Sequence, residues 1–305
     1  MNSGGDFMFV IRFRTVLCYL ALAAFLFCTV QFCTNYRHEM PVHAESEPRE
    51  EIALPILMYH AITEEPKKIG KFVISKEMLE EDLCYLREQG YQTVTVNQVI
   101  DYVKHDGSLP EKPIMLTFDD GYYNNYCYAY PLLKKYNMQA VISLIGKYTD
   151  LYTDTPDENP AYSHITWDEV REMMNSGLVE FQNHSYDLHS NSGSRNGAKR
   201  KNGESKAEYT ELLKRDLERL QEEMRLHTGS VPTAFTYPFG GISNDSRQVI
   251  KDMGFQASFS CEEKINLIRR NDPECLYQMK RFLRSHRKSA EEILNKVLKE
   301  KESLS

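Results

Sequence analysis

The stretch TFDDGYYNNY, residues 117–126, places two carboxylates side by side directly after an apolar run. That run, Ile114–Phe118, has the composition of a parallel strand covered on both faces. Gly121 permits a sharp turn immediately after it. Ligands of parallel α/β folds gather at the carboxyl ends of the strands. We therefore expect Asp119 and Asp120 to face one cavity at such an end, where their mutual repulsion requires a counter-charge.

Apolar runs of this kind recur along the chain and alternate with amphipathic segments. Leucines at helical spacing predict helices over Met78–Gln89 and Glu208–Thr228. The alternation occurs about seven times and predicts an α/β fold built as a barrel or a barrel-like sheet. The predicted strands are Leu54–His60, Thr93–Val96, Ile114–Phe118, Ala140–Ile145, Val179–Asn183, Ala234–Pro238, Ala257–Cys261 and Leu276–Leu283.

The N-terminal part has a different character. Residues 15–33 carry no charge and follow Arg12 and Arg14, and a helix of that length, roughly 28 Å, can cross a bilayer. We expect a single-pass membrane anchor with residues 1–14 in the cytoplasm and the rest of the chain outside it. A cleavable signal peptide, cut after Val42-His43-Ala44, is the alternative. Residues 34–52 are predicted to be a linker, 53–298 the folded domain and 299–305 a tail.

Composition argues against two other classes. The net charge of −7 does not favour a nucleic-acid partner. Seven cysteines without a C-x-x-C pair do not favour a zinc ribbon or a disulfide-dense module.

A second polar motif follows another predicted strand. VEFQNHSYDLH, residues 179–189, carries His184 and His189 with four residues between them. This spacing does not place both on one helix face, so we expect a strand end followed by a turn. One carboxylate and two imidazoles make three ligands for a divalent metal. Such a cation would supply the counter-charge that Asp119 and Asp120 need.

Three further stretches are expected at the same site. FTYPFG, residues 235–240, predicts a tight loop in which the N–H of Tyr237 or Phe239 could face an oxyanion, since Pro238 has none. His60 ends the first predicted strand. Arg281 lies in the last one, where it can pair with a carboxylate.

These motifs resemble those of the NodB-homology polysaccharide deacetylases, carbohydrate esterase family 4, over roughly residues 54–298. Residues 117–121 match the first motif of the family and 184–189 the second, while 237–240 resemble the third without its usual arginine. The resemblance implies a distorted (β/α) barrel. It also implies that Asp119 is the catalytic base, and that Asp120, His184 and His189 bind a metal, usually zinc, with cobalt, nickel or iron in some members.

The general acid follows from a subgroup of the family. Met58-Tyr59-His60 resembles the arrangement in poly-N-acetylglucosamine deacetylases, which places the acid before the first motif. The resemblance therefore implies His60 as the acid, and His286 is the rival. Tyr237, Pro238, Phe239 and Arg281 are expected to contact the substrate.

The resemblance predicts a metal-dependent hydrolase that removes N-acetyl groups from an N-acetylglucosamine-containing polysaccharide. Its partners would be that polymer and, through the N-terminal helix, a membrane. Two alternatives stay open. The same ligand set describes non-haem iron oxygenases, and the chain could be an inactive, glycan-binding member of the fold.

Overall fold

The computed structural model describes residues 51–191 and 195–302. Eight strands form one curled sheet, and four others form two small two-stranded sheets. The strands are β1 (Glu51–Leu54), β2 (Ile56–Tyr59), β3 (Ala61–Thr63), β4 (Val73–Ser75), β5 (Gln92–Thr93), β6 (Pro113–Phe118), β7 (Ala140–Leu144), β8 (Val179–Asn183), β9 (Ala234–Thr236), β10 (Ala257–Phe259), β11 (Asn266–Arg269) and β12 (Phe282–Leu283).

The large sheet is parallel throughout. Its strand order is β10-β9-β8-β7-β6-β2-β12, and β5 pairs with β6 beside this path. Met279, just before β12, forms a parallel bridge with Phe259 of β10. The segment that enters β12 therefore pairs with β10, while β12 itself pairs with β2. This curling is consistent with the distorted barrel expected from the sequence.

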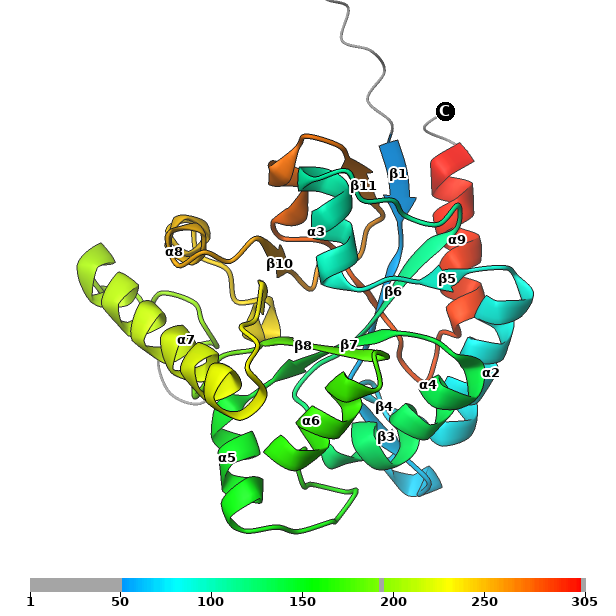
Figure 1. The fold of residues 1–305 in the computed structure, drawn as a ribbon, viewed down its shortest axis with the longest axis horizontal. Helices are drawn as coiled ribbons and strands as arrows, with labels where there is room; N and C mark the ends of the chain where they lie inside the picture. The colour runs from blue at the N-terminus through cyan, green and yellow to red at the C-terminus, as the bar shows by residue number, and fades with distance from the viewer. Residues whose placement is uncertain (1–50, 192–194, 303–305) are drawn as a thin grey trace, which may run out of the picture. The chain divides into compact units, whose positions relative to one another are not determined.

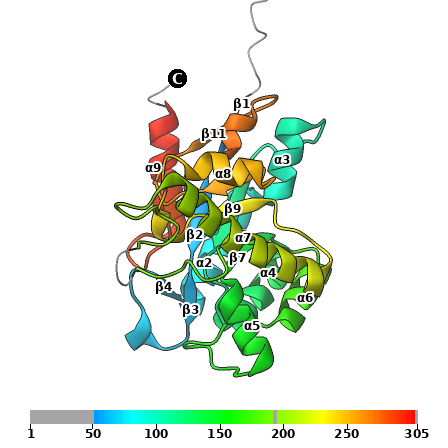
Figure 2. The same ribbon diagram turned by 90° about the vertical axis from the view of Figure 1, so that its left-hand side faces the viewer.

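Helices lie outside this sheet (Figures 1 and 2). In Figure 1, α2, α4 and α9 lie together, and α2 packs against both of the others. On the other side, α6 packs against α5 and α7, and α7 packs against α8. The helices are α2 (Lys76–Glu88), α3 (Val96–Lys104), α4 (Tyr130–Tyr136), α5 (Gly146–Asp154), α6 (Trp167–Asn175), α7 (Lys206–Thr228), α8 (Ser246–Asp252) and α9 (Ala290–Glu302).

The parallel strands are buried on both faces, as their apolar runs predict. Every residue of β2, β6 and β7 is buried. The prediction of an α/β fold with a parallel sheet is therefore confirmed. The last predicted strand is shorter than expected, because Pro273–Leu276 forms a 3₁₀ turn and only Phe282–Leu283 is strand. The short strands β1, β3, β4 and β11 were not predicted.

The predicted cytoplasmic segment 1–14 and membrane segment 15–33 lie outside the described residues. So does the predicted linker, except for residues 51 and 52, which form the start of β1. Within residues 51–191 and 195–302, no helix combines the length and the apolar character needed to cross a bilayer.

Candidate metal centre and active site

Asp119 and Asp120 follow β6 and are both buried, as their sequence position suggests. Asp120 adopts φ of +75°, and Gly121 continues with φ of +69°. A Cβ at Gly121 would lie 2.6 Å from a methyl group of Leu144, and its positive φ strains any other residue, so both features favour glycine here. The left-handed backbone takes Asp120 out of the strand geometry, and the two carboxylates acquire different partners. Asp120, a non-glycine residue at positive φ, is therefore strained, as is common where function fixes the backbone.

The two histidines are positioned by the end of β8 and the turn after it. The carbonyl of Thr236 lies 2.8 Å from Nδ1 of His184. A carbonyl only accepts, so Nδ1 carries the proton and Nε2 of the neutral ring keeps a free lone pair. Ser185 turns the chain with φ of +82°, and its N–H donates to the side chain of Asn183 at 2.8 Å. The strand end and turn predicted for this motif are therefore present.

Three ligand atoms converge between these two strand ends. Oδ1 of Asp120 lies 3.0 Å from Nε2 of His189 and 3.4 Å from Nε2 of His184. One ligand atom from each of the three residues lies within 4.8 Å of the others. The sequence-predicted ligand set is thus brought together by the fold.

A divalent cation fits this group chemically. Oδ1 of Asp120 is buried and has no hydrogen-bond partner among the described residues. A lone pair of His184 faces it, so two acceptors confront each other unless a cation or proton lies between them. Burial alone would raise the pKa of Asp120, but with protons between the groups, hydrogen bonds from His184 and His189 outweigh burial and hold this pKa well below its ordinary value. The carboxylate is therefore ionised and available as a ligand.

Asp119 is held by a buried arginine instead. Both terminal nitrogens of Arg281 donate to its two carboxylate oxygens, at 2.7 and 2.8 Å. Nε of Arg281 donates to the carbonyl of Ser260 at 3.0 Å, and the arginine is fully buried. Burial by itself would raise the pKa of Asp119, but the guanidinium lowers it below the ordinary value. Arg281 therefore orients and ionises Asp119, and it has no surface left for a substrate, which corrects its predicted substrate contact.

His60 lies beside Asp119. Its Nε2 is 3.9 Å from Oδ2 of Asp119, and its Nδ1 is buried without a hydrogen-bond partner in the described chain. Burial lowers the pKa of His60, against the pull of the neighbouring carboxylates. His286, the rival for the acid role, makes no comparable contact with Asp119.

The loop after β9 leaves one of its two candidate N–H donors, Tyr237 and Phe239, without a partner in the described chain. The N–H of Tyr237 donates to the carbonyl of Phe259 at 3.2 Å, and the Tyr237 side chain is fully buried. Pro238 is buried as well. Phe239 is 44% exposed, and its N–H donates to none of the described residues. Its ring lies 4.4 Å from that of His189. Of these three predicted substrate contacts, Phe239 is the one that reaches the surface beside the ligand group.

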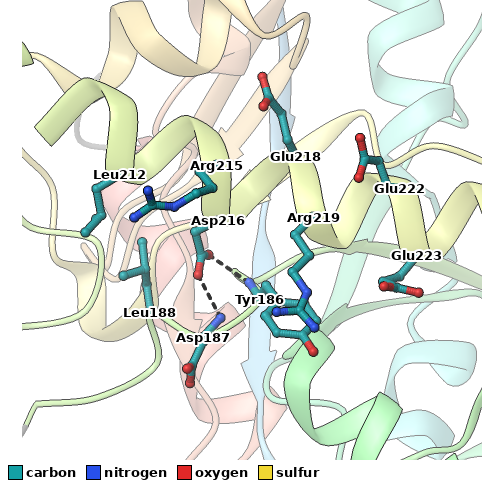
Figure 3. A pocket seen from close by; sticks show the side chains of 10 residues that line it. All are labelled: Tyr186, Asp187, Leu188, Leu212, Arg215, Asp216, Glu218, Arg219, Glu222 and Glu223. Atoms are coloured by element: carbon teal, nitrogen blue, oxygen red, sulfur yellow. Dashed lines mark hydrogen bonds between the residues drawn. The ribbon is translucent and has the colours of Figure 1, made fainter. Parts of the chain in front are cut away.

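One residue that the sequence did not reveal fixes the loop between the two histidines. Asp216 of α7 accepts hydrogen bonds from the backbone N–H groups of Tyr186 and Asp187, at 2.8 and 2.9 Å (Figure 3). Burial raises the pKa of Asp216 to about 6, although both N–H donors oppose this. The surrounding surface cleft, about 620 Å³, contains no member of the ligand group. Asp216 therefore acts on the loop and not on the ligands directly.

A second group of candidate ligands lies outside this site. Asp150, Glu223 and His227 also bring one ligand atom each within 4.8 Å of the others. The carboxylate of Asp150, however, already accepts hydrogen bonds from Trp167 Nε1 and the Tyr186 hydroxyl, both at 2.8 Å. Its oxygens are satisfied, in contrast to Oδ1 of Asp120.

Comparisons with known proteins agree with this geometry. The family model described as polysaccharide deacetylase matches residues 106–258. The poly-beta-1,6-N-acetyl-D-glucosamine N-deacetylase of Escherichia coli strain K12 is 29% identical over 224 residues, which are 68% of this chain and 33% of the relative. The protein of the same name from Staphylococcus aureus strain N315 is 29% identical over 210 residues, 68% of this chain and 67% of the relative.

Solved structures show the same fold. A de-N-acetylase from Aggregatibacter actinomycetemcomitans superposes with a TM-score of 0.67 and 29% identity, covering 80% of this chain and 99% of that one. IcaB from Ammonifex degensii superposes with a TM-score of 0.65 and 26% identity, covering 80% and 96%. The chain spans only about a third of the length of the E. coli relative.

Proposed function

This chain belongs to the polysaccharide deacetylase family, and we propose that it is a metal-dependent hydrolase that removes N-acetyl groups from an N-acetylglucosamine-containing polysaccharide. One observation carries the proposal. Asp120, His184 and His189 form a group of three ligand atoms, and the separately held carboxylate of Asp119 lies directly beside it in the chain. The names of the relatives support poly-N-acetylglucosamine as the polymer.

The proposed cofactor is a divalent cation held by Asp120, His184 and His189, most simply zinc, because zinc accepts mixed nitrogen and oxygen ligands. Cobalt, nickel and iron suit the same donors. When bound, the cation acts as a Lewis acid that acidifies water and polarises a carbonyl group. The carbonyl of Thr236 keeps the His184 ring in the tautomer that leaves Nε2 free for it.

The protein's own groups supply the proton transfers. Asp119, ionised and oriented by Arg281, accepts the proton that water loses as its oxygen attacks the acetyl carbon. His60, whose Nε2 lies 3.9 Å from Asp119, returns a proton to the amide nitrogen. The C–N bond then breaks, and acetate and a free sugar amine are the products. The free N–H of Phe239 is the proposed donor to the negative charge that develops on the carbonyl oxygen.

The proposal includes a location. The uncharged segment 15–33 would anchor the chain in a membrane, with the deacetylase domain outside the cytoplasm. Cleavage of that segment would instead release the domain. Either arrangement gives the enzyme access to an extracellular or cell-wall polymer.

Mass spectrometry tests reaction and substrate together. We expect a β-1,6-linked N-acetylglucosamine oligomer to lose roughly 42 Da for each sugar converted, with one acetate released per step. Removing the metal with a chelator should stop the reaction, and added zinc or cobalt should restore it. Binding of the oligomer without any mass loss, at full metal occupancy, would instead identify an inactive, glycan-binding member of the family.

A further inference from the structure

Two exposed aromatic rings contact histidines of the candidate active site. Six large apolar side chains are exposed among those that the structure describes, and the rings of two of them, Phe72 and Phe239, contact the ring of a site histidine. Phe239 contacts His189, as described above. Phe72 is 47% exposed, and its ring centroid is 4.9 Å from that of His60. Single exposed apolar residues need no explanation, but two exposed rings that each contact a histidine of one site point to a ligand.

The backbone around Phe72 is firmly held. The carbonyl of Phe72 accepts a hydrogen bond from the N–H of Ala61 at 3.1 Å. Gly70 and Val73 exchange two further hydrogen bonds, at 2.9 and 3.4 Å, and close the turn in which Phe72 lies. The backbone that carries the exposed ring is thus held beside His60 before any ligand arrives, which lowers the entropic cost of binding on the ring.

We propose that Phe72 forms a sugar subsite, in which the apolar C–H face of one pyranose unit of the polymer packs on the exposed phenyl ring. The inference rests on the proposed function and extends it, because it assigns the position of a sugar on the His60 side of the amide that is cleaved. An aromatic ring suits this ligand because a pyranose presents a flat apolar face and polar edges.

A neighbouring cation makes the Phe72 subsite favour neutral sugars over positively charged ones. Nζ of Lys71 lies 4.9 Å from the centroid of the Phe72 ring. A protonated sugar amine at the subsite would be repelled by this ammonium group, whereas an N-acetylated sugar is neutral. The Phe72 subsite therefore favours acetylated units over units that have already been deacetylated.

Calorimetry with a β-1,6-linked N-acetylglucosamine tetramer tests the subsite. On chelator-treated protein, which cannot turn the tetramer over, Phe72→Ala should raise Kd about three- to tenfold, and Phe72→Trp should restore it. In the metal-loaded enzyme, KM should rise by a similar factor with kcat little changed. Leu226→Ala, which removes an exposed apolar side chain from α7, is the control and should change neither.

Three results would overturn the inference. The first is an unchanged Kd in Phe72→Ala, or no binding of the tetramer by the wild type. The second is an equal loss of activity towards a small acetyl ester that has no sugar ring, since the variant would then have disturbed His60. The third concerns inhibition by the fully deacetylated tetramer. We expect this tetramer to inhibit Lys71→Gln more strongly than the wild type, and equal inhibition of the two would contradict the inference. Tetramer that binds through Phe72 but is never hydrolysed would refute the proposed function and leave the subsite standing.

Discussion

Replacing Arg281 by methionine should be the most informative single change to this protein. The arginine is fully buried, and it donates two hydrogen bonds of 2.7 and 2.8 Å to Asp119, whose side chain is 4% exposed. Breaking a buried pair of this kind leaves an uncompensated charge and costs about 3–5 kcal/mol. We therefore expect the free energy of unfolding at pH 7 to fall by that amount, measured by urea titration.

The loss of unfolding free energy in Arg281→Met should become smaller as pH falls. In the wild type, the pKa of Asp119 is lowered, so the stabilisation is present above the unfolded pKa of about 3.9 and disappears as pH falls through the folded pKa. Without Arg281, burial is no longer opposed and should raise the pKa of Asp119 above its ordinary value. The stability difference between variant and wild type should therefore begin to shrink as pH falls through the raised pKa of Asp119 in the variant, and it should go on shrinking below the unfolded pKa of about 3.9, towards the lowered pKa of the wild type.

The same change should alter catalysis. A raised pKa of Asp119 moves the acid limb of the kcat/KM profile to higher pH, because the base must be ionised to accept a proton. Arg269→Met is the matched control, since Arg269 pairs with Glu51 at 2.7 Å on the surface, where such pairs contribute about 0–1 kcal/mol. Equal unfolding midpoints for Arg281→Met and wild type, or an unmoved acid limb, would show that the pair does not tune Asp119.

Three other predictions concern the metal and the acid. His189→Gln should weaken the zinc affinity measured by chelator competition. The loss should exceed the 10–100-fold that is typical when a residue that only contacts a ligand is mutated. An unchanged affinity would exclude His189 as a ligand. Asp216→Ala leaves two backbone N–H groups unpaired and should weaken zinc affinity about tenfold, with activity restored by excess zinc. The exposed Glu222→Gln on the same helix should have no effect, and equal behaviour of the two variants would argue against a role for Asp216. His60→Gln should lower kcat by about 10²–10⁴ with full zinc content, and a normal kcat would move the acid role elsewhere.

The sequence alone predicted most of the long strands of the large sheet and the meeting of a carboxylate with two histidines at their ends. Buried parallel strands require continuous apolar runs, so Ile114–Phe118 and Val179–Asn183 were predicted close to their observed ends. Polar residues directly after such runs must lie at one edge of the sheet. This local rule was enough to predict that one carboxylate of the Asp119–Asp120 pair would meet His184 and His189, and the family resemblance singled out Asp120.

Local patterns could not reveal the short strands or the partners across the fold. The strands β3 and β4 have three residues each, too few to show an alternating pattern. Asp216 lies in an amphipathic helix like any other acidic residue, and only the packing of α7 on the loop gives it a function.

Tertiary structure decided which chemical task each site residue can perform. Arg281 and Asp119 are 162 positions apart, and the curling of the sheet that places β12 beside β2 turns the arginine into the partner of the carboxylate. The N–H of Tyr237 donates to Phe259 of β10, which leaves the N–H of Phe239 as the proposed donor to an oxyanion. Residue types and their spacing encode burial and strand ends, because these depend on neighbours in the chain. Which side chains pair across the fold depends on the curvature of the sheet, and that curvature is determined by the folding of the whole chain.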